Sequence, residues 1–118
     1  MNKQILLIDE NYKTAMVMQI ILSEYNVLYA QTKDIGMTTL QETTKVDLVI
    51  FDFDIPGMNS SKFIDSLRAN YSNIKVLTIS NDLNYAKKTL ADKQVDGFLQ
   101  GPIVDQNNIR KEVINILN

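Results

Sequence analysis

The stretch VDLVIFDFDIPGM, residues 46–58, carries the clearest structural signal in this 118-residue chain. It contains an unbroken apolar run, Leu48 to Phe51, that ends at Asp52, and Asp54 follows two residues later. A short run that is apolar at nearly every position is typical of a strand covered on both faces, as in a parallel sheet. The dipeptide Pro56-Gly57 is a strong turn signal. The stretch therefore predicts a buried parallel strand that ends at a carboxylate and a turn.

Apolar runs of similar length flank this stretch on both sides, and longer amphipathic segments separate them. The other runs are Ile5 to Ile8, Val27 to Ala30, Val76 to Ile79 and the weaker Gly97 to Leu99. Short strands that alternate with longer helical patterns are typical of βαβ units, in which helices cover both faces of a parallel sheet. We therefore predict an α/β fold, a three-layer sandwich on a five-stranded parallel sheet, with Val27 to Ala30 at its edge.

The intervening segments predict five helices, each with an apolar side toward the sheet. Their expected bounds are Thr14 to Tyr25, Asp34 to Thr44, Asn59 to Asn70, Asp82 to Lys93 and Asp105 to Leu117. The inward-facing residues expected for the first two are Val17, Ile20, Ile21 and Tyr25, then Ile35, Thr39 and Leu40. For the last three they are Phe63, Ile64 and Leu67, then Leu83, Ala86 and Leu90, then Ile109, Val113, Ile116 and Leu117.

Length and composition exclude several classes of protein. The chain fits one domain, 1–118, and its net charge of -2 without a long basic run gives no basis for direct nucleic-acid or membrane binding. Because it contains neither Cys nor His, disulfides, thiolate metal sites and imidazole chemistry are excluded, and any metal must take oxygen ligands. No signal-peptide pattern or membrane-spanning run occurs, which predicts a cytoplasmic protein.

Polar side chains follow three of the predicted strands at the point where each strand ends. Asp9 and Glu10 come after the first run, Asp52 after the third and Ser80 after the fourth. Because the carboxyl ends of parallel strands meet at one sheet edge, these groups are expected to share a site. Each also has a plainer interpretation as a turn or helix-capping residue. Gathered carboxylates repel one another unless a cation bridges them, and Mg²⁺ suits such a site.

Taken together, these residues resemble the receiver domain of two-component response regulators over nearly the whole chain. The segments that carry the resemblance are 5–10, 46–58, 76–80 and 95–102, of which 46–58 is the most specific. The resemblance implies the flavodoxin-like receiver fold with strand order 2-1-3-4-5. It also implies a signalling module of the phosphorelay, not an enzyme, which a sensor histidine kinase phosphorylates.

The resemblance also implies roles for individual residues. Asp52 would be the phosphoacceptor. Asp9, Glu10, Asp52 and the backbone carbonyl of Asp54 would bind Mg²⁺. Ser80 would donate a hydrogen bond to the phosphoryl group and, with Phe98, relay its presence to the face formed by the fourth and fifth helices. That face would bind a partner or a second copy of the chain.

Three positions depart from the family pattern. Gly101 stands where the family has a Lys before the proline, which removes a charge-assisted contact worth roughly 1.5 to 3 kcal/mol. Lys13 or Lys62 would supply the missing cation instead. Glu10 stands where Asp is usual, and Asn81 replaces a small residue after Ser80.

These departures leave a second hypothesis open, a degenerate pseudo-receiver that acts as an interaction module independent of phosphorylation. A flavodoxin-like nucleotide or flavin binder is a third hypothesis, because it shares the sheet order. The acidic loop after the first strand would repel phosphate, which disfavours it.

Overall fold

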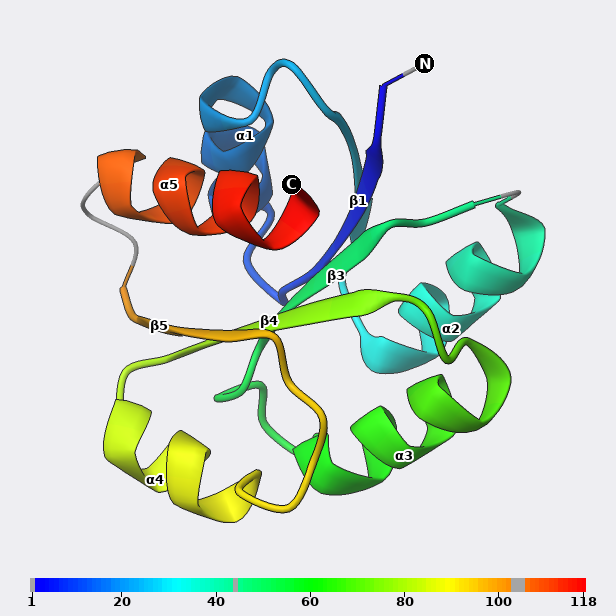
Figure 1. Cartoon of the computed structure of the whole chain (residues 1–118), viewed down its shortest axis with the longest axis vertical. Coiled ribbons are helices and arrows are strands. Elements are labelled where there is room, and N and C mark those ends of the chain that lie inside the picture. The colour runs from blue at the N-terminus through cyan, green and yellow to red at the C-terminus, as the bar shows by residue number, and fades with distance from the viewer. Residues whose placement is uncertain (1, 44, 103–105) are drawn as a thin grey trace.

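The computed structural model describes residues 2–43, 45–102 and 106–118, and it contains a parallel sheet between two layers of helices (Figure 1). The strands are β1 (Gln4–Ile8), β2 (Asn26–Ala30), β3 (Leu48–Asp52), β4 (Lys75–Ser80) and β5 (Gly97–Gln100). The helices are α1 (Tyr12–Ile21), α2 (Lys33–Glu42), α3 (Ser60–Asn70), α4 (Leu83–Thr89) and α5 (Gln106–Leu117). The sheet order is β2-β1-β3-β4-β5, which confirms the predicted architecture.

The apolar runs of β1, β3 and β4 form two cores because alternate residues of a strand point to opposite faces. On one face Leu6, Ile8, Val49, Phe51 and Val76 pack with residues of α2 and α3. On the other face Ile5, Leu7, Leu48, Ile50, Leu77 and Ile79 pack with residues of α1 and α5. Figure 1 shows α1 and α5 on one side of the sheet and α2, α3 and α4 on the other. The continuous hydrophobicity of these strands therefore reflects burial on both faces.

Side-chain caps fix where the helices begin. Asn59 accepts a hydrogen bond from the backbone N–H of Lys62 at the start of α3, and Asp82 accepts one from Tyr85 at the start of α4. The fourth helix is shorter than predicted, since regular α-helix ends at Thr89. Thr44 and Asp105, the predicted end of the second helix and start of the fifth, lie outside the described residues. The other predicted bounds agree with the structure to within a few residues.

The predicted inward stripe of the first helix is partly wrong, since Ile21 is buried and Tyr25 packs against the core as predicted, but Val17 and Ile20 do not. Val17 and Ile20 are 42% and 75% exposed, whereas Ala15 and Met18 are buried against the sheet together with Ile21. Apolar residues occur on most sides of α1, so the period of the sequence does not single out one face. The burial therefore leaves an apolar stripe of α1, formed by Tyr12, Met16, Val17 and Ile20, exposed to solvent.

The predicted inward face of the second helix is also partly wrong. Ile35 is 50% exposed, and Gly36 and Leu40 are the buried residues of α2. A Cβ atom at position 36 would lie 2.6 Å from Cδ1 of Ile8, a distance that real Cβ atoms essentially never show. The missing side chain of Gly36 thus allows α2 to approach β1 closely. In the other helices Phe63, Ile64, Leu67, Ala86, Leu90, Ile109 and Val113 are buried as predicted.

The segment after β3 turns sharply at the predicted Pro-Gly pair. Gly57 adopts a positive φ of 76°, which suits the third position of a type II turn. The turn leads the chain from the carboxyl end of β3 to the start of α3. Among the described helices, none has the length and apolar character needed to span a bilayer.

Candidate functional site

A cavity of about 270 Å³ opens at the carboxyl edge of the sheet. Its lining combines the ends of β1, β3 and β4 with the loop after β5, and it contains Asp9, Glu10, Asn11, Thr14, Asp52, Asp54, Ile79, Ser80, Asn81, Gly101 and Pro102. The structure thus brings together the four residues that follow the predicted strands. Their chemical roles stay predictions.

Strand pairing sets where these side chains lie. Ile8 is paired with Phe51 and with Ala30, so Asp9 and Asp52 follow neighbouring strands at the same level. Asp52 itself is paired with Ile79, the residue before Ser80. Because these pairings are hydrogen-bonded, the site rests on the most regular part of the fold.

The carboxylate of Asp52 is half-buried, and its surroundings disfavour the charged form. The pKa of Asp52 is raised from its ordinary value of 3.8 to about 6, mainly by burial and to a smaller extent by the negative charges of Asp9, Asp54 and Glu10. The backbone N–H of Asp54, which donates to Oδ1 of Asp52 over 2.9 Å, acts in the opposite direction. Asp52 is therefore an acidic group whose charge is poorly compensated.

The same repulsion extends to the residues around Asp52. Burial raises the pKa of Asp9, a hydrogen bond from the N–H of Asn11 lowers it, and the charge of Glu10 raises it again. The phenol of Tyr29, on the edge strand β2, has a pKa raised by burial and then by Asp9 and Glu10. A negative potential therefore fills this edge of the sheet and would attract a cation.

The donor set suits Mg²⁺ in chemistry, although the side chains are not gathered as a preformed cage. Among the residues that the structure describes, no three Asp, Glu, His or Cys side chains lie close enough together to hold a metal ion. Mg²⁺ is commonly held by one or two carboxylates and keeps several waters, so a close pair is sufficient. Asp9 and Asp52 could supply the two carboxylates, since they follow neighbouring paired strands and line the same cavity, and the charge of Asp9 raises the pKa of Asp52. Glu10 is exposed.

The side chain of Asp54 crosses to the neighbouring loop. Its Oδ1 accepts a hydrogen bond from the hydroxyl of Ser80 over 2.9 Å, and its Oδ2 accepts one from the backbone N–H of Asn81 over 2.8 Å. Ser80 is buried, and its Oγ also accepts from the N–H of Asp82 over 3.0 Å. The resemblance implied a backbone carbonyl role for Asp54 and placed its negative side chain at a position that the family uses to tune phosphoryl lifetime. The contact of its carboxylate with Ser80 was missed because it depends on how two loops meet.

No Lys or Arg is found in the part of the cavity lining that the structure describes. Lys13 lines a separate, neighbouring cavity, and Lys62 lies in the first turn of α3, outside the lining. At Gly101 an added Cβ would lie 2.9 Å from Oδ1 of Asn81, so the Asn81 side chain occupies part of the space that a longer residue would need. Asn81 and Gly101, two of the residues that depart from the pattern of the resembled family, are therefore neighbours in space.

Aromatic side chains lie beside this site. One is Phe98, which the sequence analysis predicted, and the other two, Phe53 and Tyr85, it missed. Phe98 is half-buried against the core on the α2 and α3 side, beside Thr78 of β4. The ring of Phe53, next to Asp52, meets that of Tyr85 on α4 edge-on, with 5.8 Å between centroids. Tyr85 is 60% exposed, so this ring contact links the acidic loop to an exposed surface of α4.

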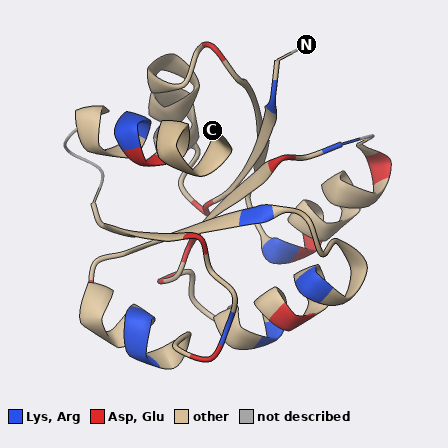
Figure 2. Cartoon of the chain, viewed as in Figure 1, with Lys and Arg blue, Asp and Glu red and all other residues tan. Residues whose placement is uncertain are grey.

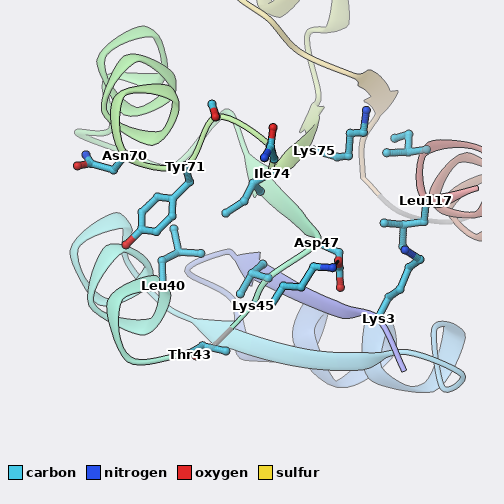
Figure 3. A pocket seen from close by; sticks show the side chains of 14 residues that line it. Lys3, Leu40, Thr43, Lys45, Asp47, Asn70, Tyr71, Ile74, Lys75 and Leu117 are labelled. Carbon is cyan, nitrogen blue, oxygen red and sulfur yellow. Dashed lines mark ion pairs between the residues drawn. The ribbon is translucent and has the colours of Figure 1, made fainter. Parts of the chain in front are cut away.

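A larger cavity, of about 590 Å³, lies at the opposite edge of the sheet, where the strands begin. Figure 3 shows Lys3, Lys45 and Lys75 around it, with Asp47 among them and apolar side chains of Leu40 and Ile74 at its wall. Nζ of Lys45 lies 3.5 Å from Oδ1 of Asp47. In the part of the chain that Figure 2 colours, Lys and Arg are distributed over helices, loops and the start of β4.

Comparison with protein families gives one match that covers most of the chain. The model of the response regulator receiver domain matches residues 5–114. A putative two-component response regulator of Arabidopsis thaliana is 26% identical over 102 residues, which cover 84% of this chain and 16% of that protein. The DNA-binding transcriptional activator EvgA of Escherichia coli is 31% identical over 81 residues, which cover 68% of this chain and 40% of that protein. The chain therefore spans less than half the length of these relatives.

Comparison with solved structures supports the fold. A response regulator from Thermotoga maritima has a TM-score of 0.88 at 20% identity, with 99% of this chain and 98% of that chain covered. The response regulator TrrA from the same organism, in complex with Mg²⁺ and beryllium fluoride, has a TM-score of 0.82 at 18% identity, with 98% and 99% covered. At these identities the likeness establishes the fold alone.

Proposed function

The chain belongs to the response regulator receiver family, and we propose that it is a phosphorylation-controlled signalling domain in which Asp52 accepts a phosphoryl group from a sensor histidine kinase. The observation that supports this most is the half-buried Asp52 carboxylate, which shares one cavity with Asp9 and Ser80. Residues 1–118 then act as one receiver domain in the cytoplasm.

Phosphoryl transfer requires the ionised form of Asp52. A carboxylate oxygen forms a bond to phosphorus while the bond from phosphorus to the nitrogen of a phosphohistidine breaks, and the nitrogen keeps the electron pair. With a pKa of about 6, most Asp52 side chains are ionised at pH 7, so burial does not prevent attack. A bound Mg²⁺ would neutralise charge on the transferred group. Asp9 and Asp52 would hold it, with Glu10 through water and Asp54 through its backbone carbonyl.

The signal would leave the site through Ser80 and Phe98. The hydroxyl of Ser80 would donate to the phosphoryl group, and Phe98 would follow the movement of β4 and the loop after it. The surface that changes would be the α4, β5 and α5 face, which would bind a protein partner or a second copy of the chain.

The test is covalent labelling of Asp52. Purified chain is incubated with acetyl phosphate and Mg²⁺, or with a phosphorylated histidine kinase, and its intact mass is measured. One phosphoryl group should be added to wild type and none to Asp52→Asn. Asp47→Asn, which removes a carboxylate at the other end of β3, is the matched control and should still be labelled. Labelling of Asp52→Asn at the wild-type level would contradict the proposal.

The pseudo-receiver remains a second candidate because no cation lines the described part of the cavity. It predicts no labelling and no response to a phosphoryl mimic. Gly101→Lys tests whether the missing cation is the cause, and it is best combined with Asn81→Ala, which removes the side chain that an added Cβ would meet. Stronger labelling of the double variant than of Asn81→Ala alone would indicate a weakened receiver. An unchanged, undetectable level in both would support the pseudo-receiver.

A further inference from the structure

The carboxylate of Asp54 uses both of its oxygens at once on the loop after β4. Oδ1 accepts the hydroxyl proton of Ser80, and Oδ2 accepts the N–H of Asn81, over 2.9 and 2.8 Å. Both distances lie within the ordinary range for hydrogen bonds, and the acceptor is a carboxylate. The oxyanion of Asp54 thus bridges two consecutive donors at the junction between β4 and α4.

One of these donors is the group that the proposed function reserves for the phosphoryl group. A Ser hydroxyl carries one proton and can donate only one hydrogen bond, and here that bond goes to Asp54. The N–H of Asn81, which lines the same cavity, is also engaged. A phosphoryl oxygen and the Asp54 carboxylate therefore cannot both accept the Ser80 proton.

The loop holds Asp54 close to these donors. The N–H of Asp54 donates to Oδ1 of Asp52 over 2.9 Å, and the N–H of Phe53 donates to the carbonyl of Ile79 over 2.9 Å. The ring of Phe53 contacts that of Tyr85 on α4. Because these contacts hold the backbone of Phe53 and Asp54 in place, the carboxylate of Asp54 has a high effective concentration at Ser80. The side chain is nonetheless exposed to solvent, so it can leave without disrupting the core.

We propose that Asp54 is a positioning residue that acts as a built-in competitor of the phosphoryl group. In the unphosphorylated chain its carboxylate occupies the Ser80 and Asn81 donors and holds their loop in an anion-bound arrangement. Phosphorylation of Asp52 must displace it. This inference rests on the proposed function of Asp52 and Ser80. It adds a residue that opposes binding of the phosphoryl group to the Ser80 hydroxyl.

The experiment compares the affinity of wild type, Asp54→Ala and Asp54→Asn for beryllium fluoride in the presence of Mg²⁺. The affinities are measured by titration monitored through the amide NMR signals. Asp54→Ala removes both the charge and the acceptors, whereas Asp54→Asn removes the charge and keeps one acceptor for Ser80. Competition predicts that Asp54→Ala binds about tenfold more tightly than wild type and that Asp54→Asn lies between them. If removal of charge alone mattered, the two variants would bind equally tightly, and the inference would be overturned.

Two outcomes of this comparison, and one further measurement, separate this inference from the proposed function. Equal binding by wild type and Asp54→Ala would overturn competition while leaving Asp52 as a working acceptor. Failure of even Asp54→Ala to bind would remove both proposals together. Without any ligand, Asp54→Ala should shift the Asn81 amide resonance and speed its exchange with solvent, because the N–H loses its acceptor. An unchanged Asn81 amide would show that the contact is not formed in solution, which also overturns the inference.

Discussion

The carboxylates at the two edges of the sheet have different partners. Where the strands begin, Asp47 accepts the N–H of Gln4 and lies 3.5 Å from Lys45, and Asp96 lies within ion-pair distance of both Arg68 and Lys75. Where the strands end, the hydrogen bonds to Asp9, Asp52 and Asp54 come from backbone N–H groups and one hydroxyl.

This difference distinguishes carboxylates that stabilise the fold through ion pairs from carboxylates whose negative charge stays available to bind a ligand. At the amino edge each charge is paired within the chain, so its removal costs stability. At the carboxyl edge the cavity lining that the structure describes supplies no cation, and burial together with the neighbouring negative charges raises the pKa of Asp52 to about 6. The same substitution of Asp by Asn should therefore change stability in opposite directions at the two edges.

The largest effect is expected at the amino edge from Asp96→Asn. Oδ2 of Asp96 accepts the N–H of Val76 over 2.8 Å and lies 3.5 Å from Nη2 of Arg68, and both side chains are mostly buried. Loss of the charge should lower the free energy of unfolding by about 2 kcal/mol, measured by urea denaturation. Asp65→Asn is the control, since its partner contact with Lys93 is more exposed, and it should cost less than about 1 kcal/mol. Equal losses of stability from Asp96→Asn and Asp65→Asn would contradict the expected difference between a mostly buried ion pair and an exposed one.

Asp52→Asn should instead stabilise the chain. Because the folded pKa of about 6 lies above the ordinary 3.8, Asp52 favours folding only while it is protonated. That contribution is complete below about pH 4 and is lost as the pH rises through 6. Without divalent metal, the variant should match wild type near pH 4 and exceed it by ~1 to 2 kcal/mol above pH 7, allowing for solvent screening. Unfolding curves at both pH values measure this, and a constant difference would contradict it.

Mg²⁺ should stabilise wild type through the carboxyl edge alone. At a free Mg²⁺ concentration tenfold above its dissociation constant, binding to the folded state adds about 1.4 kcal/mol, visible as a rise in Tm. Asp52→Asn should lose most of this rise. A Tm increase of the same size in both proteins would place the ion somewhere other than beside Asp52.

The smallest effect is expected from Lys45→Gln. The side chain of Lys45 is 77% exposed, and its contact with Asp47 spans 3.5 Å, so the stability change should stay within about 0.5 kcal/mol. The response to beryllium fluoride should not change. A large loss of stability would show that the lysines at the amino edge are coupled more strongly than their exposure indicates.

The sheet and the meeting of Asp9, Asp52 and Ser80 could be predicted because both follow from strand pattern. Continuous apolar runs indicate parallel strands, and parallel strands place their carboxyl ends at one edge. The strand order itself came from the resemblance, since the alternation of strands and helices fixes no order.

What the sequence did not predict depends on contacts between segments. The buried side of α1 was misplaced because Val17 and Ile20 are as apolar as the residues that pack inward. The contact from Asp54 to Ser80 depends on the approach of two loops, and it follows no period in the chain. The contact between Asn81 and the space at Gly101 is of the same kind.

The close approach of α2 to β1 has a consequence for which sequences this fold can accept. With 2.6 Å from a Cβ at position 36 to Cδ1 of Ile8, even one methyl group must move the end of the side chain directly before Asp9. In a library of random single substitutions selected for folding, position 36 should therefore favour glycine and other small residues, while its exposed neighbours Ile35 and Thr38 accept a wider range. The sequence changes open to this chain are thus limited by a residue that has no side chain and takes no part in the chemistry.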